Sequence, residues 1–119
     1  MPRNPANLAS LRDALRRFAA ARDWQRFHTP KNLAMALSVE AAELLEHFQW
    51  LTAEQSAKLT PARKRAVAAE VADVLLYLTR LADVLQIDPL AAARRKLRQN
   101  ARKYPIARAR GNARKYSDL

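Results

Sequence analysis

Three residue pairs, each a helix N-cap residue followed by proline, constrain the fold of this chain more than any other feature. They are Thr29-Pro30, Thr60-Pro61 and Asp88-Pro89. A threonine or aspartate side chain accepts hydrogen bonds from the free amides of a first helical turn. Proline suits the first helical position because the amide that it lacks would have no partner there. The sequence therefore predicts helices that begin at Pro30, Pro61 and Pro89.

The apolar periodicity indicates how far these helices run. The helix from Pro30 is expected to continue to about Trp50, and the helix from Pro61 to about Leu85. The last of the three must end before Pro105, because proline cannot continue a helix. The chain thus contains three long helices joined by short connectors.

Two further elements precede and separate these helices. A first helix, flanked by Pro5 and Ser10, is expected to run to about Arg22. Thr52 and Gln55 have the spacing of a capping box, which predicts a short helical turn. One glycine, no cysteine and many Ala, Leu and Arg residues are also typical of an all-α protein.

At 119 residues the chain is long enough for one modest core. We predict an all-α domain over residues 1–105, a helical bundle of four main helices, and a basic C-terminal tail over residues 106–119, whose sequence has no helical periodicity. The helices are few, and the central two are strongly apolar on one side. We therefore expect other subunits to complete the bundle.

The sequence also bears on where the protein acts. The lack of cysteine fits a reducing compartment. No apolar run approaches the roughly 20 residues of a membrane span. The N-terminal stretch MPRNPANLAS does not have the apolar core of a signal peptide. We predict a cytoplasmic protein with no membrane partner.

The net charge of +11 is concentrated toward the C-terminus. Residues 1–90 contain 12 basic and 10 acidic side chains, whereas residues 91–119 contain 10 basic side chains and one acidic side chain. A basic segment of this kind indicates a polyanionic partner, a nucleotide phosphate or a nucleic acid, or it is a solvated tail.

Four carboxylates lie beside the apolar stripes of the two central helices. At about 100° per residue, Glu40 and Glu43 fall in one narrow sector of their helix, and Glu70 and Asp73 do the same on the next helix. If these helices pack together, the four carboxylates converge. One such pair alone is typical of a solvated helix surface, but two pairs on consecutive apolar seams favour a metal site.

Converging carboxylates repel one another and lose hydration, at a cost on the order of several kcal/mol, unless they take up a proton or a cation. Oxygen ligands without a thiolate favour Mg²⁺ first and Mn²⁺ second. A di-iron centre is disfavoured, because it needs a histidine three residues after a ligating glutamate and His47 follows Glu43 by four. Glu46, nearer the polar edge, is either a base that acts beside the metal or an exposed side chain.

Aromatic side chains accompany the acids. Trp24 and His28 lie in the connector RDWQRFH, Trp50 shares the acid sector, and Tyr77 follows Asp73 by one turn. Most aromatic residues of helices belong to the core. Flat rings beside a metal-phosphate site would instead stack on a nucleobase, and His28 would hydrogen-bond the edge of that base.

Lys96, Asn100 and Lys103 fall on one face of the fourth main helix. Two cations and an amide aligned in this way suit a triphosphate. They are equally consistent with a solvated basic face near a helix C-terminus, which the helix dipole favours.

These motifs together resemble the MazG-like all-α nucleoside triphosphate pyrophosphatases, and most closely their dCTP pyrophosphatase branch. The hallmark of the family is ExxE on one helix and ExxD on the next, present here as Glu40 with Glu43 and Glu70 with Asp73. The branch features are RDWQRFHTPKNL, EHFQW, ADVLLYL, KLRQNARKYP and RKYSDL, which span most of the chain.

The resemblance implies a Mg²⁺-dependent hydrolase that converts a deoxynucleoside triphosphate, with dCTP or a modified dCTP favoured, to the monophosphate and pyrophosphate. It implies that the four carboxylates ligate the metal. The base and sugar would be framed by Trp24, His28, Trp50 and Tyr77, and the phosphates bound by Lys96, Asn100 and Lys103. The implied assembly is a homotetramer, a dimer of dimers, or a dimer, with sites near subunit boundaries.

The chain departs from this family pattern in two places. Many relatives have a further glutamate where this chain has Val39, and close relatives have a histidine on the first helix where this chain has Leu15. The alternative functions are a small basic helical protein that binds nucleic acid, and a metal-stabilised helical oligomer without catalysis. If the enzyme interpretation holds, we expect Trp24 and His28 to complete a site whose metal ligands belong to another chain.

Overall fold

The structure is a computed structural model that describes residues 4–119, and every regular element in that range is helical. The predicted all-α class is therefore confirmed. The elements are α1 (Leu8–Ala21), a 3₁₀ turn η1 (Gln25–Phe27), α2 (Pro30–Glu46), α3 (Ala53–Ser56), α4 (Pro61–Val84), α5 (Pro89–Lys103), α6 (Ile106–Ala109) and a 3₁₀ turn η2 (Tyr116–Asp118). Within residues 4–119 no helix is both long enough and apolar enough to cross a membrane.

The helices begin where the capping pairs predict. Thr29 accepts a hydrogen bond from the amide of Asn32, Thr60 from that of Arg63, and Asp88 from the amides of Leu90 and Ala91. The short helix α3 has the predicted capping box of Thr52 and Gln55. These starts are local features, so the sequence alone predicts them well.

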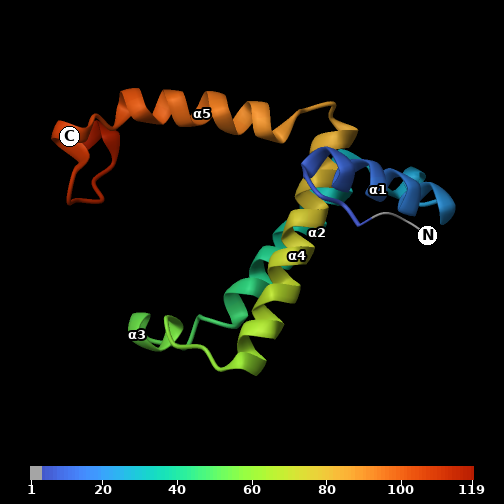
Figure 1. The fold of residues 1–119 in the computed structure, drawn as a ribbon, viewed down its shortest axis with the longest axis horizontal. Coiled ribbons are helices and arrows are strands. Elements are labelled where there is room, and N and C mark those ends of the chain that lie inside the picture. Colours follow the sequence, from blue (N-terminus) through green and yellow to red (C-terminus); the bar gives the residue numbers. More distant parts are fainter. Residues whose placement is uncertain (1–3) are drawn as a thin grey trace. The chain divides into compact units, whose positions relative to one another are not determined.

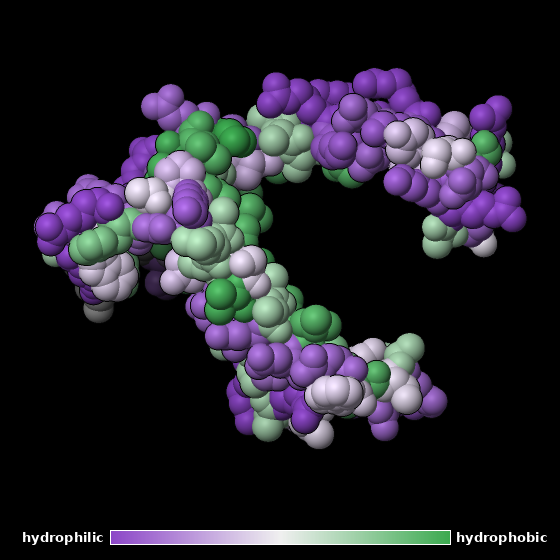
Figure 2. All heavy atoms as spheres, turned by 180° about the vertical axis from the view of Figure 1, so that it is seen from behind, coloured by the Kyte–Doolittle hydropathy of each residue, from purple (hydrophilic) through white to green (hydrophobic). Residues whose placement is uncertain are grey.

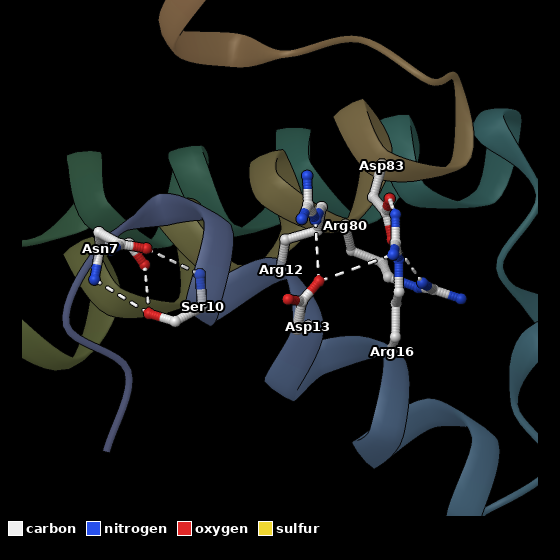
Figure 3. Close-up of polar contacts among 7 residues, drawn as sticks. All are labelled: Asn7, Ser10, Arg12, Asp13, Arg16, Arg80 and Asp83. Carbon is white, nitrogen blue, oxygen red and sulfur yellow. Dashed lines mark hydrogen bonds and ion pairs between the residues drawn. The ribbon is translucent and has the colours of Figure 1, made fainter. Parts of the chain in front are cut away.

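The cap of α1 is a capping box of Asn7 and Ser10 (Figure 3). The Asn7 Oδ1 atom accepts from the Ser10 amide at 2.8 Å, and the Ser10 Oγ atom accepts from the Asn7 amide at 3.0 Å. Ser10 is thus the third residue of the helix. The predicted first helix is present and begins at Leu8, between Pro5 and Ser10, with Asn7 as its capping residue.

The chain divides into two compact units, one ending at Gln86 and the other beginning at Ile87. In the first unit, α2 lies along α4 and α1 packs against the C-terminal part of α4 (Figure 1). The two long helices are antiparallel, because His47 near the end of α2 is bonded by Arg63, whereas His28 just before α2 is bonded by Arg80. This arrangement brings the middle of α2 opposite the middle of α4.

The helix α2 is shorter than predicted. It ends at Glu46 instead of near Trp50, and residues 47–50 form a turn. The amides of His47 and Phe48 bond carbonyls three residues earlier, and the carbonyl oxygen of His47 accepts from Arg63 Nη1 at 3.2 Å. A side chain of another helix thus bonds a carbonyl at the point where α2 stops, and no Pro or Gly marks that point in the sequence.

The second unit contains α5, α6 and η2. The expected absence of helix after Pro105 is wrong for Ile106–Ala109, because Pro105 supplies the carbonyl that the amides of Arg108 and Ala109 bond. The Tyr116 amide donates to the Tyr104 hydroxyl at 3.2 Å, which folds the end of the chain back onto the end of α5. The proposed limits of domain and tail, residues 1–105 and 106–119, stay a prediction.

The core of the first unit is small. Among the described residues, the buried ones are Ala19, Leu33, Thr79, Arg80 and Ala82. Large apolar side chains remain exposed along both long helices, namely Met35, Val39 and Leu45 on α2 and Val71, Leu75 and Leu78 on α4. Figure 2 shows hydrophobic residues at the surface of this unit, whereas α5 is mainly hydrophilic. Such exposed stripes are typical of helices that bury a face against a partner.

Leu33 tests which contacts hold the first unit together. Its side chain is 2% exposed, between α2 and the rest of the unit. We predict that Leu33→Ala lowers the free energy of unfolding by roughly 2–4 kcal/mol, because it removes buried methyl groups and leaves a cavity. Lys31→Ala, at an exposed position of the same helix, is the control and should change it by less than about 0.5 kcal/mol. Equal effects in urea unfolding would place the core elsewhere.

Candidate functional site

Three carboxylates converge where the middle of α2 faces the middle of α4. Oxygen atoms of Glu40, Glu43 and Glu70 all lie within 4.8 Å of one another, and all three side chains are half-buried. Glu40 and Glu43 share a face of α2 because residues three apart lie on the same side of a helix. The antiparallel packing then brings that face to Glu70, as the sequence predicts.

The acids perturb one another. A hydrogen bond with Glu43 raises the pKa of Glu40 to about 7, and partial burial and the charges of Glu43, Asp73 and Glu70 act in the same direction. Burial and the neighbouring charge of Glu43 also raise the pKa of Glu70. Asp73 contributes to both pKa shifts, so all four predicted acids belong to one electrostatic cluster.

Two oxygen atoms of the cluster have no partner. Glu40 Oε2 and Glu70 Oε2 are buried, and within residues 4–119 neither accepts a hydrogen bond. A buried carboxylate oxygen without a donor is costly, and either a proton or a cation removes that cost. An all-oxygen set of this kind fits a hard divalent ion, so the residues present could hold a metal.

His47 borders the cluster, and the predicted base Glu46 precedes it in the sequence. The Nε2 atom of His47 lies 4.0 Å from Glu70 Oε1, and the imidazole opposes the rise in the pKa of Glu70. His47 follows the last residue of α2, so it reaches the acids from the end of that helix. Glu46 is the last residue of α2 and is exposed.

A pocket of about 160 Å³ opens beside the acids. Its wall combines residues of α1, of the connector after α1 and of α4, and it includes the predicted base-binding residues Trp24, His28 and Tyr77. The remaining lining residues are Leu15, Phe18, Ala19, Asp73, Leu76 and Arg80. The ring of Trp24 meets those of Phe18 and His28 edge-on, with centroids 5.7 and 6.2 Å apart. The pocket is thus aromatic on one side and bordered by a carboxylate of the cluster on the other.

The pocket bears on two of the expectations. Trp24, His28 and Asp73 of one chain line it together, and the expectation that Trp24 and His28 complete the metal site of another chain stays a prediction. Leu15, which stands where close relatives are expected to have histidine, also lines it. An apolar side chain therefore occupies that part of the wall.

Trp50 does not join the other aromatic residues. It lies in the turn after α2, is 87% exposed and is not part of the pocket wall. The prediction that it shares the sector of Glu40 and Glu43 was wrong, because that sector assumed a helix that continues past Glu46. A role for Trp50 at the base stays a prediction.

The predicted phosphate-binding residues all lie in α5, in the second unit. Lys96 Nζ donates to Gln99 Oε1 at 3.3 Å, and Lys103 Nζ lies 4.7 Å from the centroid of the Tyr116 ring. The amide of Tyr104 bonds the carbonyl of Asn100 at 2.8 Å, at the end of the helix. Their role as phosphate ligands stays a prediction.

Sequence reasoning missed a charged network behind the pocket, drawn in Figure 3. Arg80, 9% exposed, donates through Nη1 to Asp83 Oδ2 at 3.2 Å, and Arg16 of α1 donates through Nε to the same oxygen at 2.8 Å. The hydrogen bond to Arg16 lowers the pKa of Asp83. A signal was present, because Arg80 continues the i, i+3, i+7 series of Glu70, Asp73 and Tyr77.

The comparisons with known proteins agree with these features. The sequence pattern of the MazG-like family matches residues 35–119. The chain is 42% identical to dCTP pyrophosphatase 1 of Bos taurus and of Homo sapiens over 104 residues, which is 86% of this chain and 62% and 61% of theirs. It thus spans about three fifths of the length of these curated relatives.

A solved structure matches as well. The crystal structure of a pyrophosphatase from Archaeoglobus fulgidus is 44% identical, with a TM-score of 0.79, over 88% of this chain and 98% of the other. The helical fold and the paired acids on α2 and α4 define an all-α protein with a candidate metal centre. The chain belongs to the MazG-like family.

The shifted pKa of Glu40 gives a test of the cluster without any ligand. The folded chain holds this proton up to about pH 7, whereas an unfolded glutamate releases it near its ordinary 4.5. The folded state therefore binds more protons in this interval, so the stability of the metal-free chain falls as pH rises from 4.5 to 7. We predict that Glu40→Gln weakens this dependence and is more stable than wild type above pH 7.

The measurement is urea unfolding in EDTA between pH 4.5 and 8. Glu54→Gln is the matched control, because the Glu54 side chain is 83% exposed, and it should keep the wild-type dependence. A Glu40→Gln profile that overlays the wild type would mean that the acids do not interact in solution.

Proposed function

We propose that this protein is a metal-dependent nucleotide pyrophosphohydrolase of the nucleotide pool, acting on a deoxynucleoside triphosphate with dCTP or a modified dCTP favoured. Hydrolysis would form a bond between the oxygen of water and the α-phosphorus. It would break the bond between the α-phosphorus and the oxygen that bridges the α- and β-phosphates, giving the monophosphate and pyrophosphate. The observation that carries this proposal is the acidic cluster with two partnerless buried oxygens, directly beside an aromatic pocket that shares Asp73.

Glu40, Glu43, Glu70 and Asp73 would hold the metal, with Mg²⁺ as the first candidate and Mn²⁺ as the second. When bound, such an ion polarises phosphate oxygens and lowers the pKa of water. The chain's own part is to hold four acids together. Glu46 is the proposed base that orients or deprotonates the water, acting from the exposed end of α2.

The pocket beside Asp73 would take the base. Trp24 and Tyr77 offer flat ring faces on which the base could stack, and a ring nitrogen of His28 could hydrogen-bond the edge of the base. The cavity of about 160 Å³ is large enough for one flat heteroaromatic ring system. The names of the relatives, dCTP pyrophosphatase 1, support cytosine as that ring. Trp50 would add a further face only if the turn after α2 moved.

The proposal also covers the phosphate-binding residues and the oligomeric state. Lys96, Asn100 and Lys103 would bind the triphosphate and stabilise the charge on the leaving pyrophosphate. The exposed apolar stripes of α2 and α4 would pack against further copies, giving a homotetramer as a dimer of dimers, or a dimer. We expect this enzyme to act in the cytoplasm.

Neutral isosteres of the acids test the metal site. We predict that Glu40→Gln, Glu43→Gln, Glu70→Gln and Asp73→Asn each lower Mg²⁺-dependent release of pyrophosphate from dCTP at least about 100-fold, because each removes an anionic oxygen ligand. The circular dichroism spectrum should stay that of wild type. Glu54→Gln, an exposed glutamate of α3, is the control. Full turnover by any two of the four variants would rule out this metal site.

The size and walls of the pocket predict the substrate. We expect kcat/KM for dCTP and 5-substituted dCTP to exceed that for dATP and dGTP by at least about tenfold, because one pyrimidine ring fits the cavity beside Trp24 and Tyr77. The check is a panel of deoxynucleoside triphosphates assayed for pyrophosphate under one metal concentration. Similar values for purines and pyrimidines would indicate a broad-range enzyme.

One observation favours a second function. Residues 87–119 carry 10 basic and two acidic side chains, a charge pattern that also suits nucleic acid. Binding to DNA or RNA would weaken steeply with salt and would not respond to Glu40→Gln. Turnover of dCTP that depends on the four acids separates the enzyme from this alternative and from a metal-stabilised oligomer without catalysis.

A further inference from the structure

A buried arginine bonds the histidine of the pocket. Arg80 Nε donates to His28 Nδ1 at 3.0 Å, while Arg80 Nη1 donates to Asp83. Asp83 is itself buried, with its side chain 7% exposed, and it also accepts from Arg16 of α1 (Figure 3). The Arg80 guanidinium is therefore fixed from one side by a carboxylate and presents its Nε–H to the imidazole.

This contact determines where the proton of His28 lies. A guanidinium has five N–H donors, no acceptor and a pKa too high for deprotonation in a protein. His28 Nδ1 must therefore offer its lone pair, so the ring is neutral and carries its only proton on Nε2. Partial burial and the charge of Arg80 both lower the pKa of His28, in agreement with a neutral ring.

The free nitrogen of this ring is available to a ligand. The ring of His28 lines the pocket with Trp24 and Tyr77, and Nδ1 is already occupied by Arg80. Within residues 4–119 no hydrogen bond engages Nε2. The one ring nitrogen left for a ligand is therefore a donor and cannot accept a hydrogen bond.

We propose that Arg80 is a positioning residue that fixes His28 as an Nε2–H donor, so that the pocket selects a base with a hydrogen-bond acceptor at this point, a ring carbonyl oxygen or ring nitrogen. The proposal rests on the proposed function for the identity of the ligand as a nucleotide. Its first step, the state of the His28 ring, rests only on the contacts of Arg80.

The fixed donor on His28 determines which edge of the base this residue can contact. Cytosine carries an amino group, which is a donor, and a ring carbonyl and ring nitrogen, which are acceptors. A donor on His28 cannot pair with the amino group. His28 therefore reads the acceptor edge of the base, and another residue must read the amino group.

Arg80→Met is the informative variant. It keeps a long apolar stem but removes the donors, and Asp83 stays paired because Arg16 bonds both of its oxygens. No buried charge is left without a partner, so the fold should survive. Arg65→Met is the matched control, because Arg65 is an exposed arginine of the same helix.

The first experiment reads the ring directly, without substrate or metal. Two-dimensional ¹H–¹⁵N spectra of histidine side chains, with His28 assigned by the loss of its signals in His28→Ala, report the proton on each nitrogen. We expect wild type and Arg65→Met at pH 7 to show a lone pair on Nδ1 and a proton on Nε2. Arg80→Met should show averaged signals of two tautomers. A proton on Nδ1 in wild type would overturn the proposal.

The second experiment measures how the pocket selects the acceptor of the base. We expect Arg80→Met to raise KM for dCTP roughly three- to tenfold with little change in kcat, the size of one hydrogen bond. Replacing the ring carbonyl by sulfur, a weaker acceptor, in 2-thio-dCTP should raise KM for wild type but no further for Arg80→Met. An unchanged KM in Arg80→Met would overturn the selective role. Equal sulfur effects in both proteins, with KM raised in Arg80→Met, would assign the acceptor to the ring nitrogen instead of the carbonyl oxygen.

A third measurement separates this proposal from the proposed function. Titration with dCMP, followed by the Nε2 signal of His28, needs no turnover. If no deoxynucleoside triphosphate is hydrolysed but dCMP shifts that signal in wild type and not in Arg80→Met, the enzyme assignment fails and the proposal stands. If dCTP is hydrolysed and dCMP leaves the His28 signal unmoved, the enzyme assignment stands and the proposal fails.

Discussion

The antiparallel seam of α2 and α4 is the constraint on which the rest of the structure depends. It brings Glu40 and Glu43 against Glu70, where like charges oppose packing. The opposing force comes from one end of the seam, where Leu33 and Ala82 are buried and Arg80 bonds His28. Apolar burial and a satisfied polar network at that end thus hold together acids that would separate if they were free.

What the sequence predicted well is local. A cap such as Thr60 with Pro61 acts within one turn, so its residues determine it. The convergence of Glu40 with Glu70 needed only helical spacing and the assumption that consecutive helices pack. The end of α2 could not be predicted in this way, since Arg63, sixteen residues from His47 in sequence, bonds the carbonyl where the helix stops.

The network of Arg80 was missed for a related reason. A single arginine on an apolar helix is normally a solvated side chain whose stem lies along the surface. Its burial here depends on Asp83 three residues later, on Arg16 from α1, and on an acceptor nitrogen from the connector. The guanidinium can be buried only when these three separate segments pack together, and no short sequence pattern predicts that packing.

One face of α4 carries residues of both the acidic cluster and the pocket. Glu70, Asp73, Tyr77 and Arg80 follow one another at spacings of three and four, so they form a single stripe along the helix. At about 1.5 Å per residue, the stripe runs about 15 Å from the acidic end to the arginine. Asp73 belongs to both the cluster and the pocket, and Arg80 closes the pocket behind His28. If the acids hold a cation, as proposed, a nucleotide along this stripe would place its phosphates at that cation and its base at His28. The reverse direction would place the phosphates against the aromatic wall and leave the cation without its anionic ligand.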